Sequence, residues 1–298
     1  MRILVSGASG LIGSALLPHL AARGHETSRL VRASSKARVA GVVWDPSAGV
    51  LDATSLEGFD AVVHLAGENI AGGRWTADKK RKILESRSKG TQLLGGTLSR
   101  LAQPPRVLVS ASAIGFYGDR GPDVMREDSP PGKGFLPEVC TAWEAATRPA
   151  ALKGIRVVTL RIGIVLSTAG GALKQMLPPF RLGLGGKIGS GRQFMSWITL
   201  DDLVGVLHHS IENDSLSGAV NAVAPNPVTN IEFTRTLGHT LSRPTILPLP
   251  AFAARLVLGE MADELLLSST RVEPAKLIAA DFHFEHSELE PALRHVLS

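Results

Sequence analysis

The 298-residue sequence predicts an α/β fold, a doubly wound parallel sheet covered by helices and followed by a small, mainly helical C-terminal domain. Short apolar runs rich in valine recur along the first two thirds of the chain, and helix-length segments separate them. This alternation stops after Pro227, and helical segments follow near residues 231–241, 251–259 and 274–280. We therefore expect a first domain over residues 1–167, with its sheet completed by residues 195–225, and a substrate domain over residues 168–298.

The chain opens with a strand, a glycine turn and a helix. The apolar run Ile3-Leu4-Val5 precedes the turn, and Leu16 and Leu20 share one face of a helix that ends near Gly24 and contains Pro18. Glycine is required where backbone turns with positive φ, approaches phosphates or lets a helix pack on a strand. Although the spacing GxxGxxG departs from GxGxxG, this context is typical of a Rossmann-type dinucleotide site, where a helix amino end binds the diphosphate. The expected cofactor contacts are Gly7, Ser9, Gly10, Leu11, Ile12 and Gly13.

The residue that follows the second predicted strand, residues 27–31, bears on whether the cofactor is NAD or NADP. That residue is Arg32, nineteen positions beyond Gly13. An acidic residue there would accept hydrogen bonds from the ribose 2′-hydroxyl of NAD, whereas arginine pairs with the 2′-phosphate of NADP. Arg32, backed by Lys36 and Arg38, therefore favours NADP(H); the alternative is a solvated basic loop.

Four further apolar runs, over residues 42–44, 61–67, 107–111 and 156–160, are continuous rather than alternating, as expected for strands buried on both faces. Ligands of such parallel sheets bind beyond the carboxyl ends of the strands. Ser112 follows one of these ends, on the same edge as Gly7 and Arg32. Further cofactor contacts are expected there from Leu65, Ala66, Gly67, Ser110, Ile164 and Val165.

Composition and charge exclude several classes of protein. No stretch approaches the ~18 apolar residues that span a bilayer, and the first strand leaves no room for a signal peptide, so we expect a cytoplasmic protein without membrane association. The single cysteine, Cys140, allows no intramolecular disulfide. The net charge is +5, and the basic run at residues 79–82 lies between acidic residues without stacking aromatics. That pattern is typical of a solvated helix face rather than a nucleic-acid site.

The histidines show no metal-ligand spacing, and we expect no metal site. His64 lies inside an apolar strand and is expected to be a packed core residue. His208 and His209 are adjacent on a predicted helix and should point in different directions.

Two long loops interrupt the alternation, at residues 119–137 and 181–192, and each is either a lid or a surface segment. The second loop lacks a P-loop signature because Ile188 follows Lys187 where Ser or Thr is required, which argues against a kinase or an ATPase. Its cations Arg181, Lys187 and Arg192 are candidates to attract an anionic substrate.

Several motifs together resemble the extended short-chain dehydrogenase/reductases: the glycine turn at 7–13, His64-Leu-Ala-Gly67, Lys89-Gly90-Thr91, Ser110-Ala-Ser112 and Leu160-Arg-Ile-Gly-Ile-Val-Leu166. Segments at residues 177–186, 189–192, 196–198, 201–203 and 271–277 resemble one atypical branch, the NAD(P)-dependent epimerase-like proteins with a C-terminal domain of unknown function. The resemblance implies the Rossmann-type fold and NADP(H) binding, and it implies no named reaction.

The sequence departs from the ordinary enzymes of this family at the proton-transfer residues. Those enzymes carry a Tyr-x-x-x-Lys pair on one helix, in which the lysine lowers the pKa of the tyrosine. Here the only tyrosine, Tyr117, is followed four residues later by Gly121, and neither register of residues 139–144 supplies the pair. Losing a positioned acid typically costs roughly 10²- to 10⁴-fold in rate, so the ordinary chemistry should be much reduced or replaced.

Three residues remain candidates for function. Ser112 occupies the place of the family's substrate-orienting serine. Tyr117 is either a substitute acid or a buried loop anchor. Arg87 stands three positions before Gly90, where extended members usually carry asparagine, and either reaches a phosphate or substrate anion or lies on a solvated helix.

We therefore expect an NADP(H)-binding, epimerase-like oxidoreductase acting on a small anionic or carbonyl-containing substrate. The alternative, motivated by the missing Tyr and Lys, is a non-catalytic NADPH-binding sensor or scaffold. The sequence does not indicate the oligomeric state.

Overall fold

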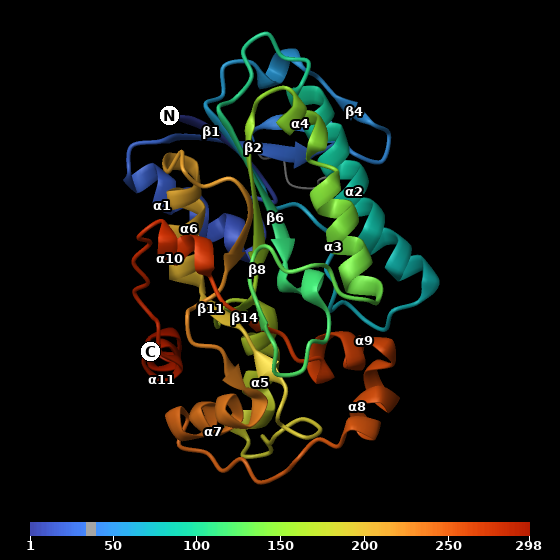
Figure 1. The fold of residues 1–298 in the computed structure, drawn as a ribbon, viewed down its shortest axis with the longest axis vertical. Coiled ribbons are helices and arrows are strands. Elements are labelled where there is room, and N and C mark those ends of the chain that lie inside the picture. The colour runs from blue at the N-terminus through green and yellow to red at the C-terminus, as the bar shows by residue number, and fades with distance from the viewer. Residues whose placement is uncertain (34–39) are drawn as a thin grey trace.

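Eight strands form the central sheet, in the spatial order β12-β8-β6-β5-β1-β2-β3-β4 (Figure 1). The computed structural model describes residues 1–33 and 40–298. Neighbouring strands of this sheet are parallel except β3 and β4, and the chain winds outward from β1 in both directions. The predicted doubly wound α/β fold is therefore confirmed. The strands are β1 Arg2–Ser6, β2 Glu26–Arg32, β3 Val42–Asp45, β4 Val50–Leu51, β5 Ala61–His64, β6 Val107–Ala113, β8 Arg156–Ile162 and β12 Gly218–Ala222.

Both faces of this sheet are buried, which explains the continuous apolar runs. Along β1, Ile3 and Val5 belong to one core cluster, and Leu4 belongs to another on the opposite face. The first face is covered by α1 (Leu11–Ala22) and α6 (Leu200–Glu212). On the other side lie α2 (Ala77–Leu98), α3 (Phe135–Ala145) and α4 (Arg148–Leu152), as Figure 1 shows. Among the described residues, no helix is long and apolar enough to cross a bilayer.

Apart from α6, α10 (Ala275–Ala279) and β12, which pack on or belong to the central sheet, the chain beyond β8 builds small sheets and a separate core. Strand β9 (Ile164–Leu166) pairs with β11 (Trp197–Thr199), β10 (Phe194–Met195) with β13 (Val228–Thr229), and β14 (Arg271–Val272) with β7 (Val124–Met125). The helices are α5 Gly171–Arg181, α7 Asn230–Thr240, α8 Ala251–Leu258, α9 Glu260–Ala262, α10 Ala275–Ala279 and α11 Leu289–Leu297, with a π-helical turn, η3, at Asp263–Leu267. Trp197, Phe233 and Leu293 lie in its apolar core. Two 3₁₀ turns, η1 Thr54–Leu56 and η2 Ile114–Tyr117, complete the elements.

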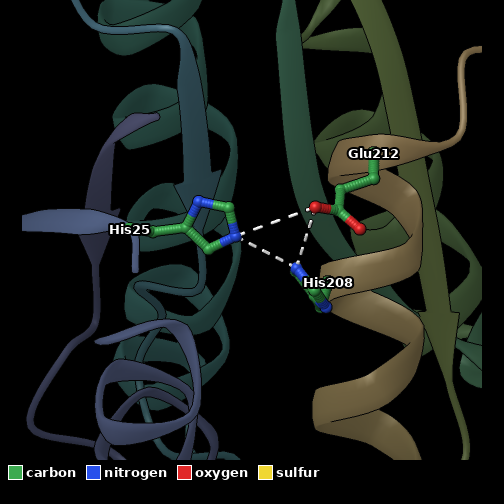
Figure 2. A group of neighbouring side chains, drawn as sticks. All are labelled: His25, His208 and Glu212. Atoms are coloured by element: carbon green, nitrogen blue, oxygen red, sulfur yellow. Dashed lines mark hydrogen bonds and ion pairs between the residues drawn. The ribbon is translucent and has the colours of Figure 1, made fainter. Parts of the chain in front are cut away.

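The first helix ends as its sequence indicates. Helix α1 continues through Pro18 to Ala22, and Gly24 follows with a φ of +78°. The backbone N–H of His25 then donates to the carbonyl oxygen of Leu20, which directs the chain into β2. His25 thereby comes to face His208 of α6 (Figure 2).

Candidate functional site

The glycine turn between β1 and α1 is shaped by close backbone contacts. Gly7 has a φ of +67°, and a Cβ atom there would lie 2.7 Å from the carbonyl carbon of Leu65. A Cβ atom at Gly13 would lie 2.4 Å from the carbonyl oxygen of Gly7. In the described chain, the amino end of α1 has neither a side-chain cap at Gly10 nor an acidic residue in its first turn. Its free N–H groups and positive dipole suit an anion such as a diphosphate. Ser9 is exposed in this turn, and Leu11 and Ile12 are half-buried.

Ser6 and His64 join the ends of β1 and β5 behind this turn. The hydroxyl oxygen of Ser6 accepts the backbone N–H groups of Leu65 at 3.1 Å and Ala66 at 3.2 Å. Because both N–H groups already donate to it, the hydroxyl donates to Nδ1 of His64, 2.6 Å away. Complete burial lowers the pKa of His64 to about 4, so the ring is neutral near pH 7. His64 is thus a packed core residue, as expected, and it fixes the turn that borders Gly7.

Arg32 lies at the carboxyl edge, at the end of β2. The register pairs Ser6, the last residue of β1, with Leu30, so Arg32 lies beyond the end of β1. Its side chain is exposed. The pKa of Glu68, in the turn after β5, is lowered mainly by a hydrogen bond from Lys79, and the charge of Arg32 makes a smaller contribution. The supporting cations Lys36 and Arg38 lie outside the described residues.

Arg87 occupies the space beside Gly67. A Cβ atom at Gly67 would lie 3.3 Å from the guanidinium carbon of Arg87. That carbon also lies 4.9 Å from the centroid of the Trp143 ring, and Nη1 donates to the carbonyl oxygen of Glu68 at 3.0 Å. Burial lowers the pKa of this guanidinium below its ordinary value. Arg87 therefore packs under the turn after β5 instead of lying on a solvated helix face.

A buried ion pair joins α3 to β8. Glu144 of α3 accepts two hydrogen bonds from Arg161 of β8, each 2.9 Å long, and one from the Ser112 hydroxyl at 2.8 Å. Arg161 is only 4% exposed, and its guanidinium carbon lies 3.5 Å from the centroid of the Phe116 ring. Burial alone lowers the pKa of Arg161, but the hydrogen bonds and charge of Glu144 outweigh it and raise the pKa overall. The Ser112 hydroxyl is therefore already engaged as a donor to a carboxylate.

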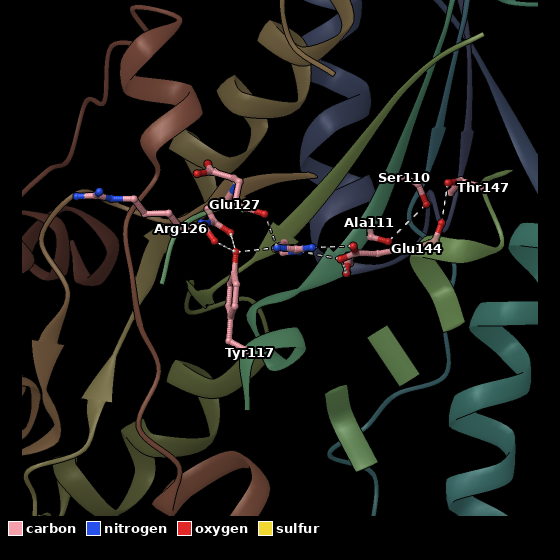
Figure 3. A network of polar contacts seen from close by, with 10 residues as sticks. Ser110, Ala111, Tyr117, Arg126, Glu127, Glu144 and Thr147 are labelled. Carbon is pink, nitrogen blue, oxygen red and sulfur yellow. Dashed lines mark hydrogen bonds and ion pairs between the residues drawn. The ribbon is translucent and has the colours of Figure 1, made fainter. Parts of the chain in front are cut away.

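Tyr117 lies on the far side of the same guanidinium (Figure 3). Its side chain is fully buried, and its hydroxyl accepts a hydrogen bond from Arg161 at 2.9 Å. The hydroxyl lies 2.7 Å from Oδ1 of Asn221 and 2.9 Å from the carbonyl oxygen of Arg126. Burial raises the pKa of the phenol. Of the two roles considered for Tyr117, these contacts correspond to the loop anchor.

Two further side chains near β6 are closed to solvent. Ser110 is fully buried within the strand, opposite His64 in the register. Burial, with a smaller effect from the charge of Glu144, raises the pKa of Cys140 to about 12. The thiol is therefore protonated and unsuited to act as a nucleophile near pH 7.

The segment after β8 approaches α1. Ile164 and Val165 are half-buried at the start of β9. The chain then reaches Gly170, where a Cβ atom would lie 3.3 Å from the Leu11 side chain. Residues that are far apart in sequence thus border the amino end of α1.

A cavity of about 260 Å³ opens next to η2. Gly115, Gly118 and Leu136 line one side of it, and Thr270 and the end of η3 line the other. Among the described residues that line this cavity, the cations are Lys133 and Arg255, and the anions are Asp119, Asp263 and Glu264. The loop cations Arg181, Lys187 and Arg192 are not among its lining residues.

The carboxyl edge brings together the glycine turn, Arg32 and the turn that ends at Gly67, while Ser112 and Tyr117 join a buried network farther along. The sequence did not identify Ser6, Arg161 or Asn221 as members of these arrangements. The available signal for Arg161 was a charged residue directly after the predicted apolar run at residues 156–160.

Two family models match the chain. The NAD dependent epimerase/dehydratase family matches residues 3–222, and a domain of unknown function, DUF1731, matches residues 249–296. An epimerase family protein of Mycobacterium bovis is 44% identical over 291 residues, which cover 98% of this chain and 96% of the relative. The human epimerase family protein SDR39U1 is 39% identical over 301 residues, which cover 100% of both chains.

Two solved structures are similar over the whole chain. The human protein SDR39U1, crystallised with NADPH, has a TM-score of 0.90 at 38% identity, with 99% of each chain covered. A nucleoside-diphosphate sugar epimerase from Corynebacterium glutamicum has a TM-score of 0.82 at 36% identity, and the match covers 100% of this chain and 58% of that one.

Proposed function

The chain belongs to the NAD dependent epimerase/dehydratase family, and on this basis we propose that it binds NADP(H) at the carboxyl edge of its central sheet and transforms a small polar substrate. The amino end of α1 would hold the diphosphate. Arg32 would hold the 2′-phosphate, because a guanidinium forms paired hydrogen bonds with phosphate. When bound, NADPH supplies a hydride to a carbonyl carbon. Further contacts would come from Leu65, Ala66, Gly67, Ile164 and Val165.

The packing at Gly13 is the observation that most strongly supports this proposal. Any side chain there would meet the carbonyl oxygen of Gly7, 2.4 Å from the Cβ position, so the turn requires glycine to bring α1 so close to β1. A turn of this kind directs backbone N–H groups at a diphosphate. The similar human protein was crystallised with NADPH, which supports the choice of cofactor.

Ser112 is the proposed substrate contact. Its hydroxyl donates to Glu144, so its oxygen remains able to accept a hydrogen bond. A substrate hydroxyl can donate to Ser112 without disturbing Glu144, whereas a substrate carbonyl must displace Glu144 as the acceptor. This favours substrates that carry hydroxyl groups next to the reacting carbon. Tyr117 enters the proposal as an anchor rather than as the acid, because its hydroxyl bonds within the protein.

A second candidate function is NADPH sensing without turnover. The observation that favours it is the Glu144–Arg161 pair, because Glu144 is one of the two positions on α3 where the resemblance would place the lysine of the ordinary enzymes. A carboxylate cannot lower the pKa of a neighbouring acid as a lysine does.

The charge pattern of α2 supports a small-molecule partner over a nucleic acid. Lys79 pairs with Glu68, Lys80 pairs with Glu260, and both Arg81 and Lys82 pair with Asp78. Paired cations lose much of their attraction for phosphate. We also propose a cytoplasmic location, which the single buried cysteine supports.

Fluorescence titration with NADPH and NADH tests the cofactor assignment. We expect NADPH to bind more tightly, and Arg32→Gln to weaken NADPH binding about 10- to 100-fold, since a hydrogen bond to a charged group contributes about 1.5–3 kcal/mol. NADH binding should not change. Arg29→Gln, an exposed arginine on the same strand, is the matched control. Tighter binding of NADH, or an unchanged preference in Arg32→Gln, would refute the role of Arg32.

NADPH absorbance with a broad panel of carbonyl compounds separates the two functions. Turnover that Ser112→Ala reduces would support the oxidoreductase and reject the sensor. Tight NADPH binding without oxidation of NADPH by any member of the panel would favour the sensor.

A further inference from the structure

Two histidines and a glutamate converge at the end of the molecule opposite the carboxyl edge. His25 lies in the turn before β2, while His208 and Glu212 lie one turn apart at the end of α6 (Figure 2). His25 and His208 are 183 positions apart in the sequence. As expected, His209 points elsewhere: its Nε2 atom lies 3.1 Å from Nδ2 of Asn213.

The three ligand atoms have the spacing of a metal-coordination polyhedron. Nε2 of His25 lies 3.1 Å from Nε2 of His208 and 3.8 Å from Oε1 of Glu212, and Nε2 of His208 lies 3.3 Å from the same oxygen. In a tetrahedral zinc site with bonds of about 2.0–2.1 Å, ligand atoms lie about 3.3–3.4 Å apart. The observed triangle therefore surrounds a point that a zinc-sized ion fits.

Hydrogen bonding among these groups accounts for the arrangement only in part. At most one proton fits between two ring nitrogens that face each other at 3.1 Å, so one Nε2 presents its lone pair to the other ring. The His25 and His208 side chains are only 8% and 14% exposed, so little water can reach these nitrogens. Glu212 is 52% exposed, which leaves a path from solvent for the ion and for one water ligand.

The neighbouring His19 packs against this cluster. Its ring packs edge to face on His208, with the ring centroids 5.3 Å apart. Within the described part of the chain, its buried Nε2 atom has no hydrogen-bond partner. A third imidazole ring, that of His19, thus lies beside the ring of His208.

We propose that His25, His208 and Glu212 bind one Zn²⁺ ion, with water as the fourth ligand. Two imidazoles and one carboxylate are a donor set that zinc favours, whereas calcium and magnesium prefer sites built from oxygen alone. The ion links the turn between α1 and β2 to the end of α6. Local spacing in the sequence gives no sign of such a site, because His25 meets the other two residues only through the fold. The zinc site is independent of the cofactor proposal.

Co²⁺ titration of the full, chelator-treated chain tests the proposal. We expect the visible absorption of four-coordinate Co²⁺, abolished by Zn²⁺, in the native chain and in His209→Ala. Replacing a ligand, in His25→Ala or Glu212→Gln, should weaken binding by more than the roughly 10- to 100-fold that changes around metal ligands cost. Glu212 is exposed, so Glu212→Gln should fold normally.

Thermal unfolding provides a second measurement. Zn²⁺ at about a hundredfold excess over its Kd should raise the Tm of the native chain and of His209→Ala by about 4 °C, and should leave His208→Ala unchanged. A second group, formed by Asp201, His286 and His295, is present in every variant, so differences between variants isolate the proposed site. Equal Co²⁺ affinity and equal Tm shifts in the native chain and the ligand variants would overturn the proposal.

Discussion

The ion pair between Arg161 and Glu144 gives a prediction about stability. Arg161→Met removes two hydrogen bonds to Glu144, each 2.9 Å long, together with those to the Tyr117 hydroxyl and the carbonyl oxygen of Glu127. It leaves the carboxylate of Glu144, 16% exposed, with only the hydroxyl of Ser112 as its hydrogen-bond donor among the described residues. Methionine keeps a long apolar side chain next to Phe116, so the change acts mainly on charge.

The size of the effect follows from burial. Removing one partner of a buried pair costs about 3–5 kcal/mol because the remaining charge has no compensation, whereas removing both costs much less. We therefore expect Arg161→Met and Glu144→Gln each to lower the free energy of unfolding by about 3–5 kcal/mol. The double variant should cost no more than either single variant, so it should fall short of their sum by about 3–5 kcal/mol.

Urea unfolding of the four proteins at pH 7 measures this interaction energy. NADPH titration should show little change in Glu144→Gln, because no hydrogen bond among the described residues joins the pair to the glycine turn. Additivity of the two changes within about 0.5 kcal/mol would refute the reasoning. So would a loss below about 1 kcal/mol in Arg161→Met, the size expected of an exposed ion pair.

Three further variants test individual contacts. Tyr117→Phe removes the donor to Asn221 and should cost about 1–3 kcal/mol of unfolding free energy without changing NADPH affinity; loss of turnover at unchanged stability would instead identify Tyr117 as an acid. Gly13→Ala should weaken NADPH binding and cost about 1–3 kcal/mol through overpacking. Its control, Gly24→Ala, has open space at the Cβ position and should lose only about 1–2 kcal/mol to its left-handed backbone, with full NADPH affinity. Burial sets the pKa of His64 at about 4 in the folded protein, against about 6.5 unfolded, so the unfolded state binds the proton first and stability falls as the pH drops from 6.5 to 4. This difference in pKa corresponds to about 3 kcal/mol of unfolding free energy. His64→Asn keeps an acceptor for the Ser6 hydroxyl and should flatten the profile of stability against pH between pH 6.5 and 4. An unchanged profile would contradict the assignment.

The sheet was predictable because its strands are buried on both faces. Such strands are apolar along most of their length, and turn residues separate them. Each apolar run can therefore be recognised as a strand from its own residues. The second strand runs one residue further at each end, over Glu26–Arg32 instead of residues 27–31. Gly7 and Gly13 were predictable for a related reason, since their roles depend on backbone geometry within one short segment.

The polar networks were not predictable, because their members meet only in three dimensions. Ser6 and His64 belong to different strands, and each alone resembles an ordinary core residue. The sequence allows Arg87 to be a phosphate or substrate contact or a solvated side chain, but its environment depends on Trp143, which lies on another helix. The sequence itself shows that the Tyr-x-x-x-Lys pair is absent. It does not show that Arg161 is the residue that neutralises Glu144.

Crystals of the full chain grown with NADPH test the central claim most directly. The diphosphate should lie within hydrogen-bond distance of the backbone N–H groups of Leu11 and Ile12, with the 2′-phosphate beside Arg32. A cofactor bound anywhere else, or a carboxyl edge still empty at saturating NADPH, would contradict the account.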